Sequence, residues 1–289
     1  MLSRRARAQV VGDYCRLMRQ TARGSYNDRL LASRAELRLY GECQLIFKEL
    51  KHAVVATQPS FADPAFNTSL TSEMLAFRGR ELPGFTNSQV FHGFMAQNVE
   101  SWRPAVDACR NRYIQAAHTV SRALIDTLAP AYPALCNAIR NITVARIEAL
   151  ADAVVSKLDD VFTKEADPYT TNESMVELID QIRARNFEIA LNSSLGAAGQ
   201  RGSLDEIKAH TKASLGDWYI KTHGVNTTSK VEDMCTILQA YWSVATKRLV
   251  DNVRATHETH AAARARERGT SAPEAWPSSR APFALLRCA

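Results

Sequence analysis

The chain has 289 residues, 46% of them hydrophobic and 23% charged, with a formal net charge of +6. This composition is typical of a folded protein, and a total of 12 glycines argues against a turn-rich β fold. No run of about 18 apolar residues occurs, so the sequence predicts no membrane-spanning segment. We expect a cytoplasmic, all-α protein that at most lies on the surface of membranes.

The N-terminal 23 residues are predicted to form a basic helix or linker, helical from Val10 to Arg23. A solvated helix face explains such a cluster of positive charge, and a surface for lipid headgroups or nucleic acid is the alternative. The arginines in this stretch are Arg4, Arg5, Arg7, Arg16, Arg19 and Arg23.

One long helix is then predicted from about Asn27 to Thr57. Its apolar residues recur every three or four positions, which places them on one helix face. Pro59 and Pro64 predict an irregular segment from Gln58 to Leu82. The stripe of the helix consists of Tyr40, Cys43, Phe47, Leu50 and Val54.

The segment F-R-G-R-E-L-P-G-F at Phe77–Phe85 is predicted to form a tight loop. Gly79 and Gly84 permit unusual backbone angles, and Pro83 stiffens the turn. Leu82 and Phe85 would anchor this loop through apolar contacts.

A helix from Asn87 or Ser88 to about Leu128 is expected to follow. The Asn87 side chain can accept hydrogen bonds from free amides at the helix start. Pro104 lies inside this helix and should kink or divide it.

Three further helices are predicted at 134–164, 173–191 and 203–222, separated by D-P-Y-T-T-N-E at 167–173 and by a glycine-rich linker at 196–202. Ser203 with Glu206 three residues later matches a capping box. A loop is expected at 224–229. The residues expected to face inward on the first two of these helices are Ile147, Leu150, Val154, Leu158, Val161, Met175, Leu178, Ile182 and Ile189.

The last predicted element is a helix from Val231 to Val253, which is expected to continue to about Arg268. Lys247 and Arg248 on this helix are expected to pair with acids on neighbouring helices. Its apolar stripe and the adjoining Trp242 are packing candidates by their spacing of three and four. These candidates are Met234, Leu238, Tyr241, Trp242, Ala245, Leu249 and Val253, with Val231 at the start of the stripe.

The segment Q-A-Y-W-S-V-A-T-K-R-L-V-D-N-V at 239–253 resembles the start of the GTPase effector domain of the dynamin superfamily. Phe77–Phe85 resembles a loop of the dynamin and Mx stalk. Looser similarity occurs at 21–31 and 167–173, and the resemblance covers about Gln9 to Val253. It implies an elongated antiparallel helical bundle, divided into a basic helix or linker (1–23), stalk helices (24–200), a return helix with a shortened effector region (201–256) and a basic, largely disordered tail (257–289).

The resemblance also implies a role in self-assembly, because dynamin-like stalks associate and bring GTPase domains together. It assigns Arg78, Gly79, Arg80, Glu81, Leu82, Pro83, Gly84 and Phe85 as assembly-loop candidates. The expected partners are a second copy or a full-length dynamin-like relative, with an anionic membrane as a peripheral surface and no nucleic acid. No cofactor is expected, since GTP and Mg²⁺ would belong to a GTPase domain that this chain lacks.

Enzymatic activity is not expected from this sequence. The phosphate-binding pattern G-x-x-x-x-G-K-[ST] is absent. H-E-x-H at 257–260 is one residue short of the zincin motif and is expected to lie on a solvated helix face. The six cysteines form no C-x-x-C pair, which favours buried, reduced thiols.

Two alternative interpretations remain at the level of sequence. In one, the chain is part of a complete dynamin-like GTPase. In the other, it is an unrelated helical scaffold that binds anionic lipid or nucleic acid through its arginine-rich ends.

Overall fold

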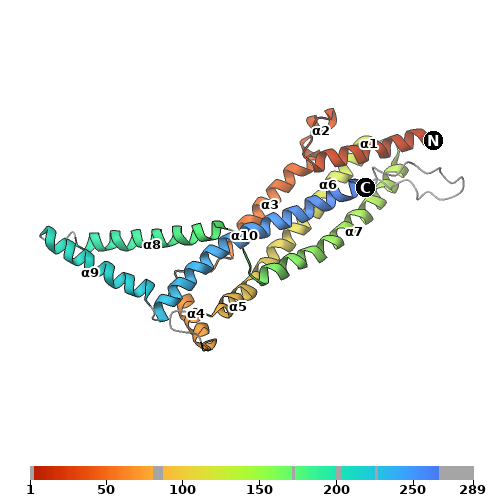
Figure 1. The fold of residues 1–289 in the computed structure, drawn as a ribbon. Coiled ribbons are helices and arrows are strands. Elements are labelled where there is room, and N and C mark those ends of the chain that lie inside the picture. Colours follow the sequence, from red (N-terminus) through yellow and green to blue (C-terminus); the bar gives the residue numbers. More distant parts are fainter. Residues whose placement is uncertain (1–2, 81–86, 171–172, 199–202, 225–226, 267–289) are drawn as a thin grey trace. The chain divides into compact units, whose positions relative to one another are not determined.

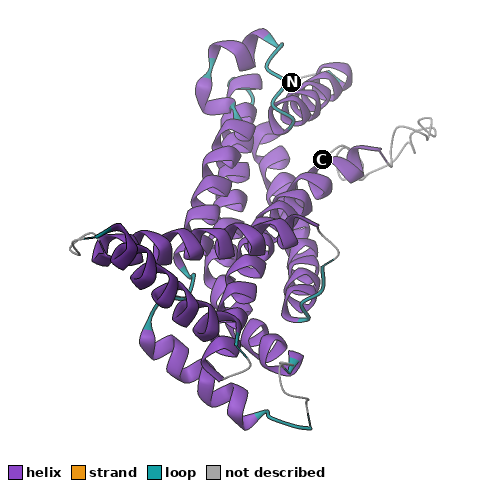
Figure 2. Cartoon of the chain, turned by 60° about the vertical axis from the view of Figure 1, so that its left-hand side comes forward, coloured by secondary structure: helices purple, strands orange, loops and turns teal. Residues whose placement is uncertain are grey.

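The computed structural model describes residues 3–80, 87–170, 173–198, 203–224 and 227–266, and all regular structure in these ranges is helical (Figures 1 and 2). Helix accounts for 87% of the structure, which confirms the predicted all-α class. The elements in chain order are α1 (Arg4–Ala22), α2 (Arg29–Ser33), the 3-10 helix η1 (Ala35–Leu37), α3 (Leu39–Ala56), α4 (Pro64–Ala76), α5 (Ser88–Val99), the 3-10 helix η2 (Glu100–Trp102), α6 (Arg103–Leu128), α7 (Pro133–Ala166), α8 (Glu173–Ala198), α9 (Leu204–His223) and α10 (Thr227–Arg266).

The chain divides into two compact units, each assembled from segments that are distant in sequence. Unit 1 contains Met1–Val54, Trp102–Phe162 and Val250–Ala289, and unit 2 contains Val55–Ser101 and Thr163–Leu249. Helices α3, α7 and α10 contribute residues to both units. The four consecutive parts expected from the sequence are a different kind of division and stay a prediction.

In unit 1, α1 packs against α6 through apolar side chains on both helices. Across this contact the hydroxyl oxygens of Tyr14 and Ser121 are 2.8 Å apart, so two buried polar groups satisfy each other. Near the end of α10, the ring of His257 contacts the rings of Phe47 and Tyr113, with centroid distances of 6.0 and 4.8 Å. The buried apolar residues of α1 and α6 include Val11, Tyr14, Cys15, Leu17, Val106, Cys109, Ala117, Val120, Leu124 and Ile125.

The prediction of a single helix from Asn27 to Thr57 is wrong, because α2, η1 and α3 occupy this stretch. Arg34 has an extended backbone, with φ −124° and ψ 104°, which ends α2. The hydroxyl of Thr21, at the end of α1, donates to the carbonyl of Leu37 and accepts from the amide of Leu39 at 2.8 Å. One buried side chain from another helix thus satisfies backbone groups at the break, and local periodicity cannot reveal such a contact.

In unit 2, the irregular segment predicted at 58–82 contains α4, so this prediction is also wrong in part. Pro64 occupies the first turn of α4, where a missing N–H costs nothing. The Asp63 carboxylate accepts from the amide of Ala65 at 2.9 Å and caps the helix. The proline thus begins a helix rather than ending one.

The predictions for the next helices are confirmed in outline. Asn87 caps α5 by accepting from the amide of Gln89 at 2.9 Å. The predicted helix from 87 to 128 is divided at η2, and Pro104 lies in the first turn of α6. Ser203 and Glu206 form the predicted capping box of α9.

The predicted inward faces of α7 and α8 are only partly buried. Val154 and Leu158 of α7 are buried, whereas Ile189 of α8 is exposed, which contradicts the prediction for that residue. Helix α8 also continues through Gly196 to Ala198, so the first residues of the expected linker are helical, and residues 199–202 lie outside the described residues. Helix α10 begins at Thr227, within the loop expected at 224–229.

Helices α8 and α9 pack against each other within unit 2. The hydroxyls of Ser194 and Ser214 are 2.8 Å apart, and the ring centroids of Phe187 and Trp218 are 5.6 Å apart. These two contacts follow in opposite order along the two helices, so the pair is antiparallel. Figure 1 shows the two helices meeting at one end and diverging toward the other.

Five cysteines within the described ranges are buried thiols that form no disulfide, as predicted: Cys15, Cys43, Cys109, Cys136 and Cys235. Cys288 lies outside them. Across the same ranges, no helix is both long enough and apolar enough to cross a bilayer.

Candidate functional site

The packing stripe of α10 is the part of the structure that corresponds most closely to the sequence-predicted site. Spacing of three and four positions puts its members on one face of the helix, and all of them are buried: Met234, Leu238, Tyr241, Trp242, Ala245, Leu249 and Val253. The Tyr241 ring also packs edge-on against Phe91 of α5, with centroids 5.2 Å apart. This face of α10 therefore serves as core.

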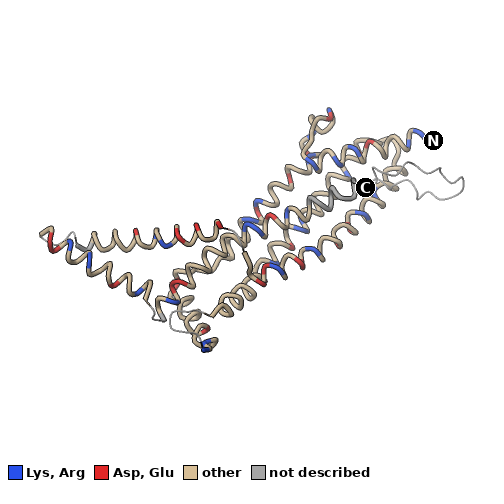
Figure 3. Tube along the Cα trace, in the orientation of Figure 1, with Lys and Arg blue, Asp and Glu red and all other residues tan. Residues whose placement is uncertain are grey.

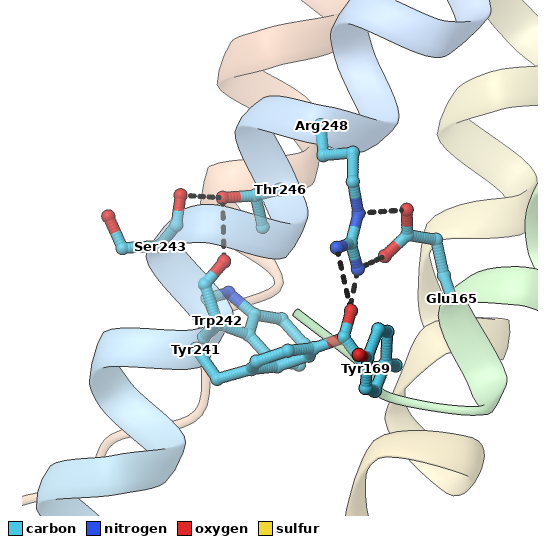
Figure 4. A network of polar contacts seen from close by, with 7 residues as sticks. All are labelled: Glu165, Tyr169, Tyr241, Trp242, Ser243, Thr246 and Arg248. Carbon is cyan, nitrogen blue, oxygen red and sulfur yellow. Dashed lines mark hydrogen bonds and ion pairs between the residues drawn. The ribbon is translucent and has the colours of Figure 1, made fainter. Parts of the chain in front are cut away.

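An ion pair between a buried glutamate and a half-buried arginine joins α10 to the end of α7 (Figure 4). The guanidinium of Arg248 donates from Nε to Glu165 Oε1 at 2.7 Å and from Nη2 to Glu165 Oε2 at 2.6 Å. Nη2 also donates to the hydroxyl of Tyr241 at 2.9 Å, and Nη1 donates to the carbonyl of Tyr169 at 3.2 Å. Such two-pronged pairing gives geometric specificity as well as energy.

The two members of this pair differ in burial, and their hydrogen bonds shift the pKa values of Arg248 and Tyr241. Glu165 is 1% exposed and Arg248 has a side chain that is 32% exposed. The hydrogen bond that Arg248 donates to Glu165 raises the pKa of Arg248 above its usual value, although burial acts in the opposite direction. Burial raises the pKa of Tyr241, with the Arg248 hydrogen bond opposing it, so this hydroxyl stays protonated near neutral pH.

Sequence reasoning predicted that Arg248 pairs with an acid, and this is confirmed, but Glu165 was missed. A signal for it exists in the sequence. Glu165 continues the spacing of Val154, Leu158 and Phe162, all of which are buried on α7. A carboxylate in an apolar register requires a partner of opposite charge, because burying it alone is costly.

The loop candidates lie only partly within the described residues. Arg78, Gly79 and Arg80 are described and exposed, whereas Glu81, Leu82, Pro83, Gly84 and Phe85 lie outside the described residues. The two ends of the loop are tied together, because the side chain of Asn87 donates to the carbonyl of Phe77 at 2.9 Å. Asn87 thus ends one segment and caps the next helix at the same time.

Within the described residues, no group of three or more histidine, cysteine, aspartate and glutamate side chains could hold a metal ion. The expectation that His257 lies on a solvated face is wrong: its ring is buried, and Nδ1 lies 2.7 Å from the carbonyl of Val253. The side chains of Glu258 and His260 lie outside the described residues.

Helices α8 and α9 carry a large share of the exposed apolar side chains. Val176, Leu204 and Tyr219 are 61%, 66% and 61% exposed, and none of the residues of α9 is buried. Exposed large apolar side chains are a feature of protein interaction sites. The exposed large apolar residues of this pair are Val176, Phe187, Ile189, Leu195, Leu204, Tyr219 and Ile220.

No protein-family model, no curated protein and no solved structure matches the chain.

Proposed function

We propose that this chain is a self-assembly module, built as an elongated antiparallel helical bundle that corresponds to the stalk and the start of the effector region of a dynamin-like GTPase. The resemblance at 77–85 and 239–253 supports this assignment. The all-helical structure and the burial of the α10 stripe are compatible with it. In this proposal the chain hydrolyses no GTP and works in the cytoplasm.

The exposed apolar surface of α8 and α9 is the observation that carries the proposal. A helical pair that leaves Val176, Leu204 and Tyr219 in solvent gains stability if another surface covers these residues. The occupant we propose is a second copy of the chain. The exposed charges support this choice, because both helices carry both signs and the pair can complement itself across a two-fold axis. Examples are Glu173, Glu177 and Arg185 on α8, and Asp217 and Lys212 on α9.

Assembly through this surface would bring partner GTPase domains together and stimulate hydrolysis in them. The same assembly would serve membrane remodelling or an Mx-like activity. GTP and Mg²⁺ would bind to those GTPase domains and not to the residues of this chain. The partner is then a second copy or a full-length dynamin-like relative.

The test is the oligomeric state of the double variant V176E/L204E, measured by sedimentation over a range of protein concentrations. Both side chains are exposed and glutamate favours helices, so the variant should fold. We expect its self-association to be at least about tenfold weaker than that of the wild type. The matched control is L45E/V144E, which places two glutamates at unit 1 positions that are 55% and 38% exposed.

A wild-type protein that stays at 32.1 kDa at every concentration would refute self-assembly. Equal weakening in both double variants would instead assign the effect to added charge. The assembly loop has its own test, since Phe85→Asp should reduce self-association without loss of helix in circular dichroism. Unchanged sedimentation of that variant would remove the loop from the proposal.

A further inference from the structure

The positive charge of this protein is concentrated at its N-terminus. Residues 1–38 contain nine arginines, no lysine and three carboxylates, a net charge of +6 that equals the net charge of the whole chain. The other 251 residues are therefore neutral in sum. Figure 3 shows basic residues along α1. The nine arginines are Arg4, Arg5, Arg7, Arg16, Arg19, Arg23, Arg29, Arg34 and Arg38.

The helical repeat gathers part of this charge on one face of α1. At 100° per residue, Arg5, Arg16 and Arg19 point to the same side, together with Arg23 just after the last turn. The buried residues Tyr14 and Thr21 lie on the opposite side, against the core of unit 1. The exposed side is the arginine face, which we define as Arg5, Arg16, Arg19 and Arg23; it extends for about 27 Å.

Most of this charge is not neutralised within the described residues. Arg16 is paired, with Asp28 at 2.7 Å and Asp13 at 3.2 Å. Arg5, Arg7, Arg19, Arg23 and Arg29 have no ion pair to an acid in those ranges and are exposed. Intramolecular pairing therefore explains Arg16 and leaves Arg5, Arg7, Arg19, Arg23 and Arg29 available to a partner.

On this side of α1, the residues between these arginines have small side chains, and none of them has a large apolar side chain that could insert into a partner. Ala8 and Gly12 lie between Arg5 and Arg16 on the same side, and a Cβ added at Gly12 would meet nothing within 4 Å. From residue 3 to residue 38 no large hydrophobic side chain is exposed. A partner would thus be held by charge alone, and its surface can approach the helix closely.

We propose that the arginine face of α1 is a peripheral docking surface for an anionic lipid bilayer. Guanidinium groups pair with phosphate through two parallel hydrogen bonds, and an arginine-only set favours phosphate-bearing headgroups. A straight row of charges suits a planar surface. Nucleic acid is disfavoured, because no aromatic side chain from residue 3 to residue 38 is exposed for stacking on bases. This inference does not depend on the proposed self-assembly.

The strength of such docking follows from the number of free arginines. Each basic residue near an anionic surface strengthens binding about fivefold at physiological salt. Removal of Arg5, Arg19 and Arg23 should therefore weaken binding on the order of 100-fold. Because the contact is electrostatic, raising the salt concentration should weaken it steeply.

The experiment is co-sedimentation of the full chain with two kinds of vesicle, phosphatidylcholine alone and phosphatidylcholine with about one quarter phosphatidylserine. The test variant is R5Q/R19Q/R23Q. The matched control, K48Q/R122Q/K157Q, removes three exposed positive charges from other helices. We expect the wild type and the control to bind the anionic vesicles and the test variant to lose about 100-fold in affinity. The single variant R19Q, with an expected fivefold loss, repeats the test with less change to the helix.

Three results would overturn the proposal. The first is wild-type binding that is equal on the two kinds of vesicle. The second is an equal loss in the test and control variants, because net charge rather than the arginine face would then account for binding. The third is tighter binding to duplex DNA than to the anionic vesicles at the same salt concentration.

Discussion

At the scale of single residues, we expect the pair of Glu165 and Arg248 to be the interaction whose disruption destabilises the fold most. Glu165 is buried, and its carboxylate depends on the two hydrogen bonds from Arg248. Loss of one partner would leave a buried charge without compensation, which costs far more than the pair contributes as a whole.

Arg248→Met should lower the free energy of unfolding by about 3 kcal/mol in urea denaturation. The matched control is Arg183→Met, whose pair with Asp233 at 2.6 Å has both side chains more than 40% exposed. That exposed pair should contribute at most about 1 kcal/mol. The double variant R248M/E165L should recover much of the loss, and a purely additive double variant would contradict the coupling of these two residues.

The buried thiols predict a loss of stability in alkali. Burial raises the pKa of Cys109 to about 12, with Cys43 as a smaller cause, and it raises the pKa of Cys235 to about 11, with Glu232 as a smaller cause. The folded state therefore holds these protons more tightly than an unfolded chain with a thiol pKa of 9.0. The stabilisation is complete below that value and is lost as the pH rises toward 11 and 12.

Urea midpoints at about pH 8 and about pH 10 measure this effect, and the midpoint should fall at the higher pH. Cys109→Ala should show a smaller fall than the wild type, even though its midpoint starts lower because of the cavity. Alkylation of both thiols in the native protein should be slow at about pH 8, since the thiolate is the reactive form. Rapid native alkylation of Cys109 would contradict this account.

At the scale of elements, α9 and α10 differ in how much of their surface is buried. The capping box at Ser203 and Glu206 gives α9 a strong local start signal. However, α9 has no buried residue, whereas α10 buries a continuous apolar stripe. Most helix stability in proteins comes from tertiary packing rather than from propensity, so the two helices should differ greatly in local stability.

Hydrogen exchange followed by mass spectrometry tests this difference. Amides of α9 should exchange at least about 100-fold faster than those of α10 between Val231 and Leu249. The test belongs at low protein concentration, because self-assembly through α8 and α9 would protect α9. Equal protection of the two helices in the monomer would show that α9 is held by contacts other than those described above.

At the scale of the whole molecule, neither compact unit is a continuous stretch of chain. Unit 1 requires the segment that begins at Val250, and unit 2 requires both Val55–Ser101 and Thr163–Leu249. A single cut therefore leaves at least one unit incomplete. The necessary contacts join residues far apart in sequence, which must be brought together at the cost of loop-closure entropy.

Fragments 1–170 and 173–289, divided between α7 and α8, provide the measurement. Each fragment alone should lack a cooperative thermal transition in circular dichroism, and co-expression of the two should restore one. The fragment 1–170 lacks α10 and therefore lacks its buried residues Leu238, Tyr241 and Trp242. A cooperative transition of that fragment alone, at the wild-type temperature, would contradict the interdependence of the segments.

The sequence by itself determined the all-α class, the position of most helices and several caps. These features depend on interactions within a few residues, such as the Asn87 and Ser203 caps or the α10 stripe. Only the tertiary structure decided the features that depend on distant residues. Thr21 divides the predicted helix at Leu37, Glu165 is the partner of Arg248, and Ile189 is exposed. Periodicity shows which face of a helix is apolar, but the packing of distant helices decides whether that face is covered.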